Sequence, residues 1–393
     1  MSVDWPVRCL TDVVSLPVGQ VSPLDEPYRG QILLAPDHIS AGTGEILKRE
    51  TAESQGAVSG KYVVRPGDVV FSKIRPALRK VVLADFEGIC SADTYPLKPG
   101  ADVLGEFVKA VLLGKSFSRY VESLSGRTGI PKVNRADLAG FSFPVPPLPE
   151  QQRIVDVLQS VAKLERGIEA SIVKLRSVRE GLLLSLTGGR SDSPMTPLRE
   201  LLDRLEVGVP SMGPEGVPNP GEWGVMRLGA VTSGNFDAQK IKRILSQVRV
   251  RPELEISRGD VLMVRVNGSA RLVGSVCVVD EVPRRIMLSD LVMRLVADVR
   301  VLDPAYLGAV LVAPHVRRQI VSKFRGTSGQ FQLPQEELRS VEIPLPSVVR
   351  QRKDVDVIAT CDRKITREAD ELAKLRQLKA GLVDDLLSGR VAV

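Results

Sequence analysis

The feature that most constrains this chain of 393 residues is an internal repeat. Residues 126–190 align without a gap on residues 326–390, at a constant offset of 200. The positions with identical residues in both copies include, in the numbering of the first, Gly129, Leu138, Pro144, Pro146, Gln151, Val155–Val157, Lys174–Arg176, Gly181–Leu182 and Gly189–Arg190. Upstream, residues 66–70 correspond more weakly to 258–262. An ungapped match of this length marks a tandem duplication, so the chain folds as two copies of one plan.

The first part of each copy has a mixed α/β character. Short β-rich runs at 61–64, 68–73 and 80–84 are separated by Gly, Pro and Asp, and runs at 260–266 and 271–279 repeat the pattern. We expect an α+β fold with two mixed α/β heads at residues 1–145 and 191–343.

The second part of each copy is helical, at residues 146–190 and 344–393. Apolar residues recur there in steps of three and four, which predicts a helix with an apolar seam. The seam positions are Val161, Leu164, Ile168, Ile172, Leu175, Val178, Leu182 and Leu186, then Ile358, Cys361, Ile365, Leu372, Leu375, Leu378, Leu382 and Leu386. Prolines precede each helix and glycines follow it. Two matching helices bury their seams most simply against each other, so we expect an antiparallel coiled coil with pseudo-twofold symmetry.

Composition narrows the function classes. Lys and Arg outnumber Asp and Glu 54 to 47, a net charge of +7, which permits a nucleic-acid partner without requiring one. The four cysteines lie far apart and form no CxxC pair, as in a reduced cytoplasmic protein. No secretory signal and no apolar stretch of about 20 residues is present, so we expect no membrane partner.

The motifs of catalysis are missing from the sequence. There is no GxGxxG after a strand and no HExxH. Gly114-Lys115-Ser116 resembles the end of a phosphate-binding loop, but Lys109 stands where that loop needs its first glycine. The two histidines, His38 and His315, are interpreted as structural or exposed. We expect no catalytic residue, no metal site and no cofactor on this chain.

Four stretches carry a resemblance to a known family. They are PLPEQQRIVDVL at 147–158, PLPSVVRQRKDVDVI at 344–358, GDVVFSKIRPALRKVV at 67–82 and GDVLMVRVNGSARLVG at 259–274. Together they resemble the specificity (S) subunit of type I restriction-modification systems. The second helix start departs from the family pattern by lacking the full Glu-Gln-Gln/Arg run, although the repeat itself stays intact.

The resemblance implies a function in phage defence. Members of that family carry two target-recognition domains, each reading one half of a split site on double-stranded DNA. Their two long helices separate these domains and dock modification (methyltransferase) subunits. S-adenosylmethionine and ATP are then expected on the modification subunits and on restriction (motor and nuclease) subunits. The alternatives are a coiled-coil scaffold with two protein- or peptide-binding heads, and a free-standing enzyme, which the missing motifs disfavour.

The residue types that read DNA occur at equivalent places in both heads. Bases are read by Arg, Lys, Asn and Gln, whereas phosphates take Lys, Arg, Ser and Thr. The candidate DNA-binding residues of the first head are Lys73, Arg75, Arg79, Lys80, Arg127, Thr128, Lys132, Asn134 and Arg135. Those of the second head are Arg265, Asn267, Ser269, Arg271, Arg325, Thr327, Ser328, Gln330 and Gln332. For any single residue, a solvated loop position is the alternative.

Polar residues repeated along the helices are candidates for partner binding. They are Gln151, Arg153, Lys174, Arg176, Gln351, Lys353, Lys374 and Arg376. The cations among them have three interpretations. They contact a modification subunit, they contact DNA between the half-sites, or they are exposed flanks of the seam.

Overall fold

The structure is a computed structural model. It describes residues 5–124, 132–187, 193–210, 213–216, 218–219, 221–244, 250–282, 285–326 and 329–391. Contacts divide the chain into two compact units, residues 1–169 with 370–393 (unit 1) and residues 170–369 (unit 2). Each unit joins one head to one half of each long helix, a grouping that differs from the four segments expected from the sequence. No helix among the described residues is long and apolar enough to span a membrane.

The head of unit 1 is built on two sheets and a terminal strand pair. A four-stranded antiparallel sheet has the order β2 (Val14–Ser15), β8 (Thr94–Pro99), β5 (Val69–Ser72), β6 (Val81–Leu83). A three-stranded sheet has the order β3 (Ile32–Leu34), β7 (Gly88–Cys90), β4 (Tyr62–Val64), with β3 and β7 parallel. β1 (Val7–Cys9) pairs with β9 (Ser142–Pro144). β5 is buried along its whole length, which explains its continuous run of Val, Val and Phe.

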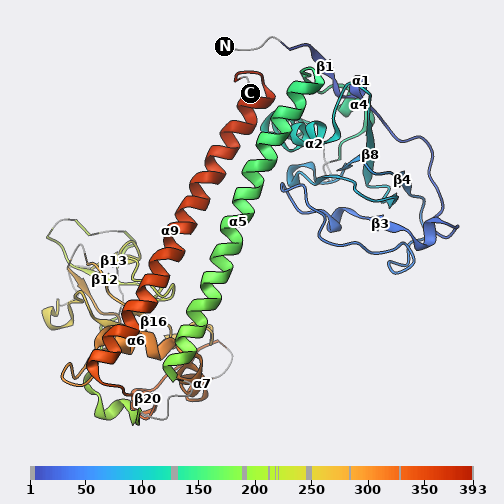
Figure 1. The fold of residues 1–393 in the computed structure, drawn as a ribbon. Coiled ribbons are helices and arrows are strands. Elements are labelled where there is room, and N and C mark those ends of the chain that lie inside the picture. Colours follow the sequence, from blue (N-terminus) through green and yellow to red (C-terminus); the bar gives the residue numbers. More distant parts are fainter. Residues whose placement is uncertain are drawn as a thin grey trace. The chain divides into compact units, whose positions relative to one another are not determined.

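Helices cover the four-stranded sheet of unit 1. They are α1 (Leu10–Val13), α2 (Gly105–Leu113), α3 (Lys115–Ser123), α4 (Arg135–Ala139), the first half of α5 (Leu148–Thr187) and the last part of α9 (Val348–Leu387). One core joins them, because Leu112 of α2, Ile154 of α5 and Leu386 of α9 are buried in the same cluster as Phe71 of β5. Figure 1 shows α2 beside the upper end of α5.

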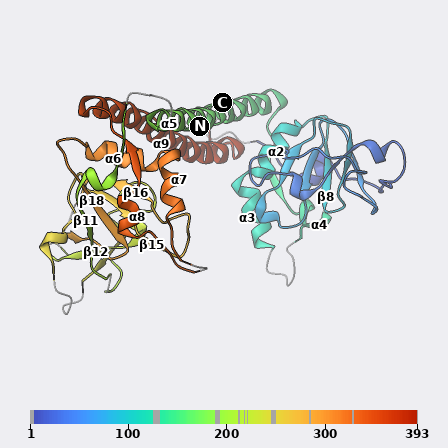
Figure 2. The same ribbon diagram turned by 90° about the horizontal axis from the view of Figure 1, so that it is seen from below.

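Unit 2 repeats this plan. Its four-stranded sheet has the order β11 (Leu202–Val207), β18 (Val292–Ala297), β14 (Val261–Val264), β16 (Val276–Val278). The remaining strands are β13 (Ile241–Arg243), β12 (Gly224–Met226) and β17 (Ile286–Met287) in one sheet, and the pairs β10 (Met195–Pro197) with β20 (Glu342–Pro344) and β15 (Val266–Asn267) with β19 (Phe331–Gln332). Helices α6 (Pro304–Val312), α7 (Pro314–Ser322) and α8 (Gln335–Arg339) correspond to α2, α3 and α4. Figure 2 shows α6 between this sheet and the long helices, with α7 beside the sheet.

The long helices α5 and α9 run antiparallel, as expected. In unit 1, the carboxylate of Glu165 on α5 accepts hydrogen bonds from Arg376 at 2.8 Å and Lys379 at 2.7 Å on α9. Burial works to raise the pKa of Glu165, but the two donors outweigh it, so the pKa lies below its ordinary value. In unit 2, the thiol of Cys361 is buried and lies 3.5 Å from the carbonyl oxygen of Leu175.

The predicted seam is only partly buried. Ile172, Ile358, Leu372 and Leu386 are buried as expected. Leu164, Val178 and Leu378 are wrong as seam positions, because their side chains are 60%, 48% and 70% exposed. A pair of helices covers a narrow stripe on each partner, so the outer positions of a broad apolar face stay in solvent.

Candidate nucleic-acid interface

Two distant segments of unit 1 meet where β5 ends. The backbone N–H of Lys73 donates to the carbonyl oxygen of Asp93 (3.0 Å), and that of Val133 donates to the carbonyl oxygen of Lys73 (2.8 Å). Ile74 and Lys132 form an antiparallel bridge beside them. The polar residues predicted at 73–75 and at 132–135 therefore belong to one surface.

The side chain of Tyr95, on the neighbouring strand β8, organises this surface. The ammonium nitrogen of Lys73 lies 4.9 Å from the centroid of the Tyr95 ring, and the guanidinium carbon of Arg135 lies 5.8 Å from it. Arg135 also donates to the carbonyl oxygen of Pro17. Tyr95 is only 7% exposed, and burial, with the neighbouring Tyr62, raises its pKa, so the ring carries no charge at neutral pH. We call Lys73, Arg75, Lys132 and Arg135 the first polar cluster.

The other predicted residues of the first head have different surroundings. Arg75 and Arg79 flank the short 3-10 turn Pro76–Leu78, each with φ of 48°, and Arg79 donates to the carbonyl oxygen of Leu113 at 3.5 Å. The ammonium of Lys80 donates to the carbonyl oxygen of Pro36 at 2.6 Å. Asn134 caps α4 by accepting a hydrogen bond from the Asp137 N–H at 2.9 Å. Arg127 and Thr128 lie outside the described residues.

Unit 2 has the equivalent backbone contact between the end of its central strand and a later segment, and we call this contact the closure of each head. The N–H of Leu333 donates to the carbonyl oxygen of Arg265 (2.9 Å), as Val133 does to Lys73. Val266 then pairs with Gln332, and Gln332 exchanges two backbone hydrogen bonds with Arg325 (2.8 and 2.9 Å). This brings together Arg265, Asn267, Gln330 and Gln332, which we call the second polar cluster.

The side chains of the second head are held less tightly. One nitrogen of Arg265 lies 3.4 Å from the carbonyl oxygen of Asp290, while its Nε is buried with no partner among the described residues. The oxygen of the Asn267 side chain accepts from the N–H of Ser269 at 2.8 Å. The carbonyl oxygen of Arg271 accepts a hydrogen bond from the side chain of Arg317. The side chain of Arg325 donates to the carboxylate of Glu337 at 2.6 Å. Gln330 and Gln332 are exposed, and Thr327 and Ser328 lie outside the described residues.

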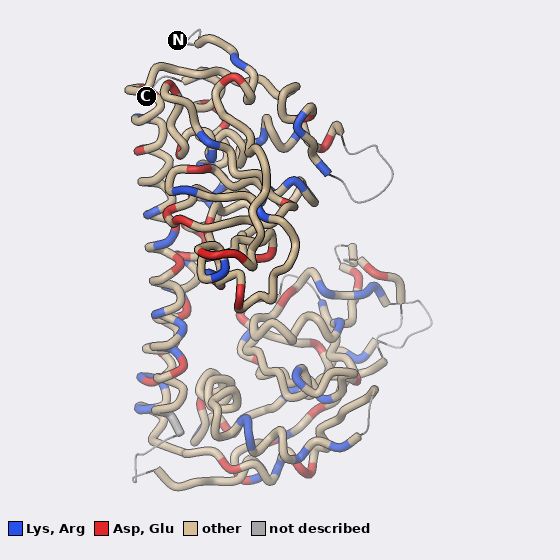
Figure 3. The backbone as a smooth tube through the Cα atoms, turned by 90° about the vertical axis from the view of Figure 1, so that its right-hand side faces the viewer, with Lys and Arg blue, Asp and Glu red and all other residues tan. Residues whose placement is uncertain are grey.

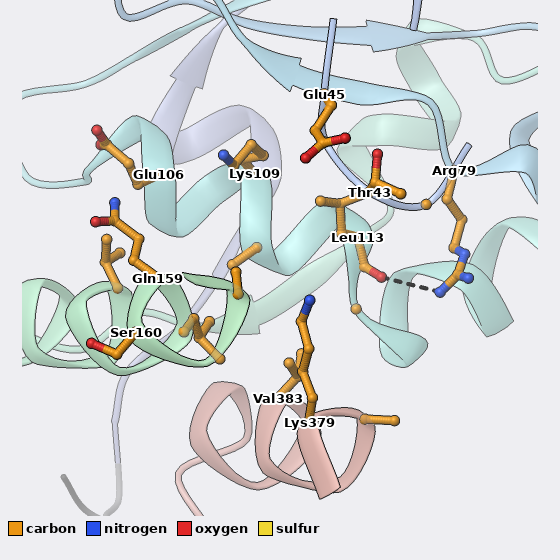
Figure 4. A pocket seen from close by; sticks show the side chains of 18 of the residues that line it. Thr43, Glu45, Arg79, Glu106, Lys109, Leu113, Gln159, Ser160, Lys379 and Val383 are labelled. Carbon is orange, nitrogen blue, oxygen red and sulfur yellow. Dashed lines mark hydrogen bonds between the residues drawn. The ribbon is translucent and has the colours of Figure 1, made fainter. Parts of the chain in front are cut away.

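A cavity of about 990 Å³ lies in unit 1 between the head, α5 and α9. Its described lining includes seven basic and four acidic side chains, so the cavity is suited to binding a surface that carries both positive and negative charges. Figure 4 shows Lys379 from α9 on one side of it, with Lys109 from α2 and Glu45 on the opposite side. Burial lowers the pKa of Lys109. Arg79, which we predicted to bind DNA, and Arg376, which we predicted to bind a partner, both line this cavity.

Gln151 and Gln351 have surroundings that sequence reasoning missed. Both side chains are fully buried, so neither is available to the partner for which it was proposed. Gln151 accepts from the N–H of Leu104 (2.8 Å) and donates to the carbonyl oxygens of Asp102 (3.0 Å) and Pro146 (2.8 Å). Gln351 makes the same three bonds within unit 2. Their identity at the repeat offset was the signal that pointed to a shared internal role.

The remaining predicted partner residues lie on the exposed helix faces. They are Arg153, Lys174, Arg176, Lys353, Lys374 and Arg376. Figure 3 shows basic and acidic residues alternating along the visible helices instead of gathering in one block. Among the described residues no group of His, Cys, Asp and Glu has the arrangement of a metal site. His38 is buried beside Glu50, whose carboxylate lies 3.6 Å away, and His315 is exposed.

Comparison with known proteins finds a family similarity in the N-terminal part of the chain. Residues 2–174 match the family described as type I restriction modification DNA specificity domain. The EcoDI type I restriction enzyme specificity subunit of Escherichia coli is 34% identical over 184 residues, which are 46% of this chain and 40% of that protein. The matched stretch thus spans less than half the length of this curated relative.

Solved structures share the fold over nearly the whole chain. A chain from a structure of the assembly and conformational transition of the type I R-M system has a TM-score of 0.64 at 19% identity, covering 98% of both chains. The HsdS subunit from Thermoanaerobacter tengcongensis has a TM-score of 0.54 at 19% identity, covering 98% of this chain and 97% of that one. Residues 2–174 are thus similar to the type I restriction modification DNA specificity domain, the fold is shared over nearly the whole chain, and the resemblance to type I specificity subunits is confirmed.

Proposed function

We propose that this chain selects the DNA site of a type I restriction-modification complex, with each head reading one half of a gapped sequence. The observation that carries this proposal is the matched closure in the two units, which gathers the first and second polar clusters at equivalent places. Phosphate-binding and base-reading side chains are what a duplicated DNA reader needs there. Because the two clusters differ in composition, the two half-sites are expected to differ.

The helices are proposed to set the unread gap and to dock the modification subunits. Each contains 40 residues, or about 60 Å of helix at ~1.5 Å per residue. Val178 and Leu378 are equivalent in the repeat, and both side chains are largely exposed. Lys174 and Lys374 lie one turn before them on the same helix faces. An exposed apolar residue beside a cation is suited to a protein partner, and no such exposure is needed for the coiled coil itself.

In this proposal the chain performs no covalent chemistry. Methyl transfer from S-adenosylmethionine falls to the modification subunits, and ATP-driven cleavage falls to restriction subunits where the system has them. The chain supplies recognition of double-stranded DNA and the geometry that presents the site to these partners.

The test is long-read methylation mapping of DNA from cells that express the neighbouring methyltransferase with and without this chain. Adenine methylation in a split motif with a fixed gap, present only with this chain, is the expected result. Absence of such methylation from a folded complex with an active methyltransferase would contradict the proposal. A coiled-coil scaffold with protein-binding heads would then be the better interpretation. A variant with a lengthened loop outside both clusters, at residues 53–57, serves as the matched control.

A further inference from the structure

The chemistry of the two polar clusters differs at positions that the fold makes equivalent. The shared closure aligns Lys73 with Arg265, Arg75 with Asn267 and Lys132 with Gln332. The first cluster therefore consists of cations, which only donate hydrogen bonds, whereas the second mixes a cation with amides, which donate and accept. Phosphate contacts read no sequence and would be served by the same cations in both heads. A change from cation to amide at equivalent positions is what base reading requires.

Among the described residues, an aromatic ring fixes the donors of the first polar cluster and no ring does so in the second. Register in the antiparallel sheets places Phe71 opposite Tyr95 in unit 1 and Met263 opposite Met293 in unit 2. Tyr95 thus has Met293 as its counterpart, and a thioether offers no face of π electrons to a cation. The Tyr95 ring holds two cations, each within about 6 Å of its centroid. Both side chains thereby lose freedom before any ligand binds, which favours directional contacts.

We propose that Tyr95 holds Lys73 and Arg135 as a pair of donors that reads a guanine edge in the major groove, at one position of the first half-site. This inference rests on the proposed function. Guanine presents two adjacent acceptors, O6 and N7, to the major groove, whereas adenine presents an acceptor and a donor at the same places. Two donor-only side chains therefore leave the adenine amino group unpaired, and Tyr95 is a positioning residue that acts through them.

The environment of the pair supports a base contact over a phosphate contact. Asp93 accepts the N–H of Lys73 through its carbonyl oxygen and faces Lys132 with its carboxylate at 3.7 Å. A carboxylate in the cluster repels phosphate. Lys132 is thus paired with a carboxylate, whereas Lys73 and Arg135 face the Tyr95 ring and Arg135 also donates to a backbone carbonyl oxygen. The cluster is consequently more selective in direction than a cluster of unrestrained cations.

The experiment measures methylation at every single-base variant of the site, using the full chain with its methyltransferase in cells. Tyr95→Leu removes the ring, Tyr95→Phe retains it, and Met293→Leu is the matched control in the second head. We expect Tyr95→Leu to reduce the preference for guanine at one position of one half-site by about tenfold, the scale of one good base contact. Tyr95→Phe restores that preference, and the preferences of the other half-site stay unchanged. Met293→Leu alters neither.

A second pair of variants keeps the test decisive if Tyr95→Leu does not fold. Lys73→Gln and Arg135→Gln leave the ring in place, and each is expected to relax or redirect the same guanine position toward adenine. Equal weakening at all positions would overturn the inference, because it would make the pair a phosphate contact. Loss of preference at a position other than guanine would also overturn it. A wild-type chain that directs no split-motif methylation would instead contradict the proposed function, so the two failures are distinguishable.

Discussion

Replacing Gln151 by Met removes the side-chain hydrogen bonds that join the head of unit 1 to the start of α5. The side chain is fully buried and makes three hydrogen bonds of 2.8–3.0 Å. Met fills a similar volume but leaves the N–H of Leu104 and the carbonyl oxygen of Pro146 without these partners. A buried backbone group that loses its partner costs about 1–3 kcal/mol, while the carbonyl oxygen of exposed Asp102 can turn to water. We expect unit 1 to lose about 3 kcal/mol of unfolding free energy.

The chain contains one tryptophan in each unit, which allows the effect to be located. Trp5 is buried in the core of unit 1, and Trp223 packs on the core of unit 2. Urea unfolding followed by Trp5 fluorescence in a Trp223→Phe background reports on unit 1. The matched control is Gln152→Met, whose exposed side chain bonds only Asp156 among the described residues. A loss below about 0.5 kcal/mol, or one equal to the control, would refute the reasoning.

Gln151→Glu separates hydrogen bonding from packing. The carboxylate keeps the shape of the amide but faces two carbonyl oxygens with an acceptor in place of a donor. Burial and this repulsion raise the folded-state pKa of the new carboxyl. The destabilisation relative to glutamine is therefore largest at neutral pH and shrinks as the pH falls and the group takes up a proton. A pH-independent loss would show that shape alone matters at this position.

Three further results are expected from other features. Glu165→Gln should lower the stability of unit 1 by about 1 kcal/mol at pH 7. Because the pKa of Glu165 is lowered in the fold, the difference should begin to shrink as the pH falls through the ordinary value of 4.5 and vanish only below the lowered folded-state pKa, as acid titration of unfolding would show. Burial raises the pKa of Cys90 and of Cys277 to about 12, so both thiols should resist alkylation at pH 8 in the folded chain and react in urea, which mass spectrometry would detect. Leu378→Glu should abolish co-purification of the methyltransferase while unit 1 stays folded. Full retention of the methyltransferase would exclude the helix face at Leu378 as its docking site.

The repeat predicted the main architecture, because an offset of identical residues carries over into equivalent elements. Both helices, their antiparallel pairing and the buried thiol of Cys361 follow from apolar spacing. The exposed positions within that spacing, Leu164 and Leu378, were not predictable. Burial there depends on how narrow a stripe the partner helix covers, which the apolar periodicity does not encode.

For the candidate site, the sequence predicted which types of residue take part, but few of the contacts that these residues make. Lys73 and Lys132 were expected in one functional group, and the chain closure brings them together. The role of Tyr95 was not visible, since a tyrosine in a buried strand has the pattern of an ordinary core residue. Gln151 was assigned to a partner because it is one of the polar residues repeated along the two helices. Its burial depends on backbone groups of the head that lie almost 50 residues earlier in the chain.

The discontinuous make-up of unit 1 has a consequence for the order in which the chain folds during synthesis. Residues 1–169 leave the ribosome first, yet Leu386, only 2% exposed, belongs to their core. At roughly 5–20 residues per second, the remaining stretch takes on the order of 10–40 s to translate. Residues 170–369 form unit 2 without such a wait. Unit 2, with the second head, is therefore able to finish folding before unit 1, and the nascent first head is the part that needs protection by chaperones.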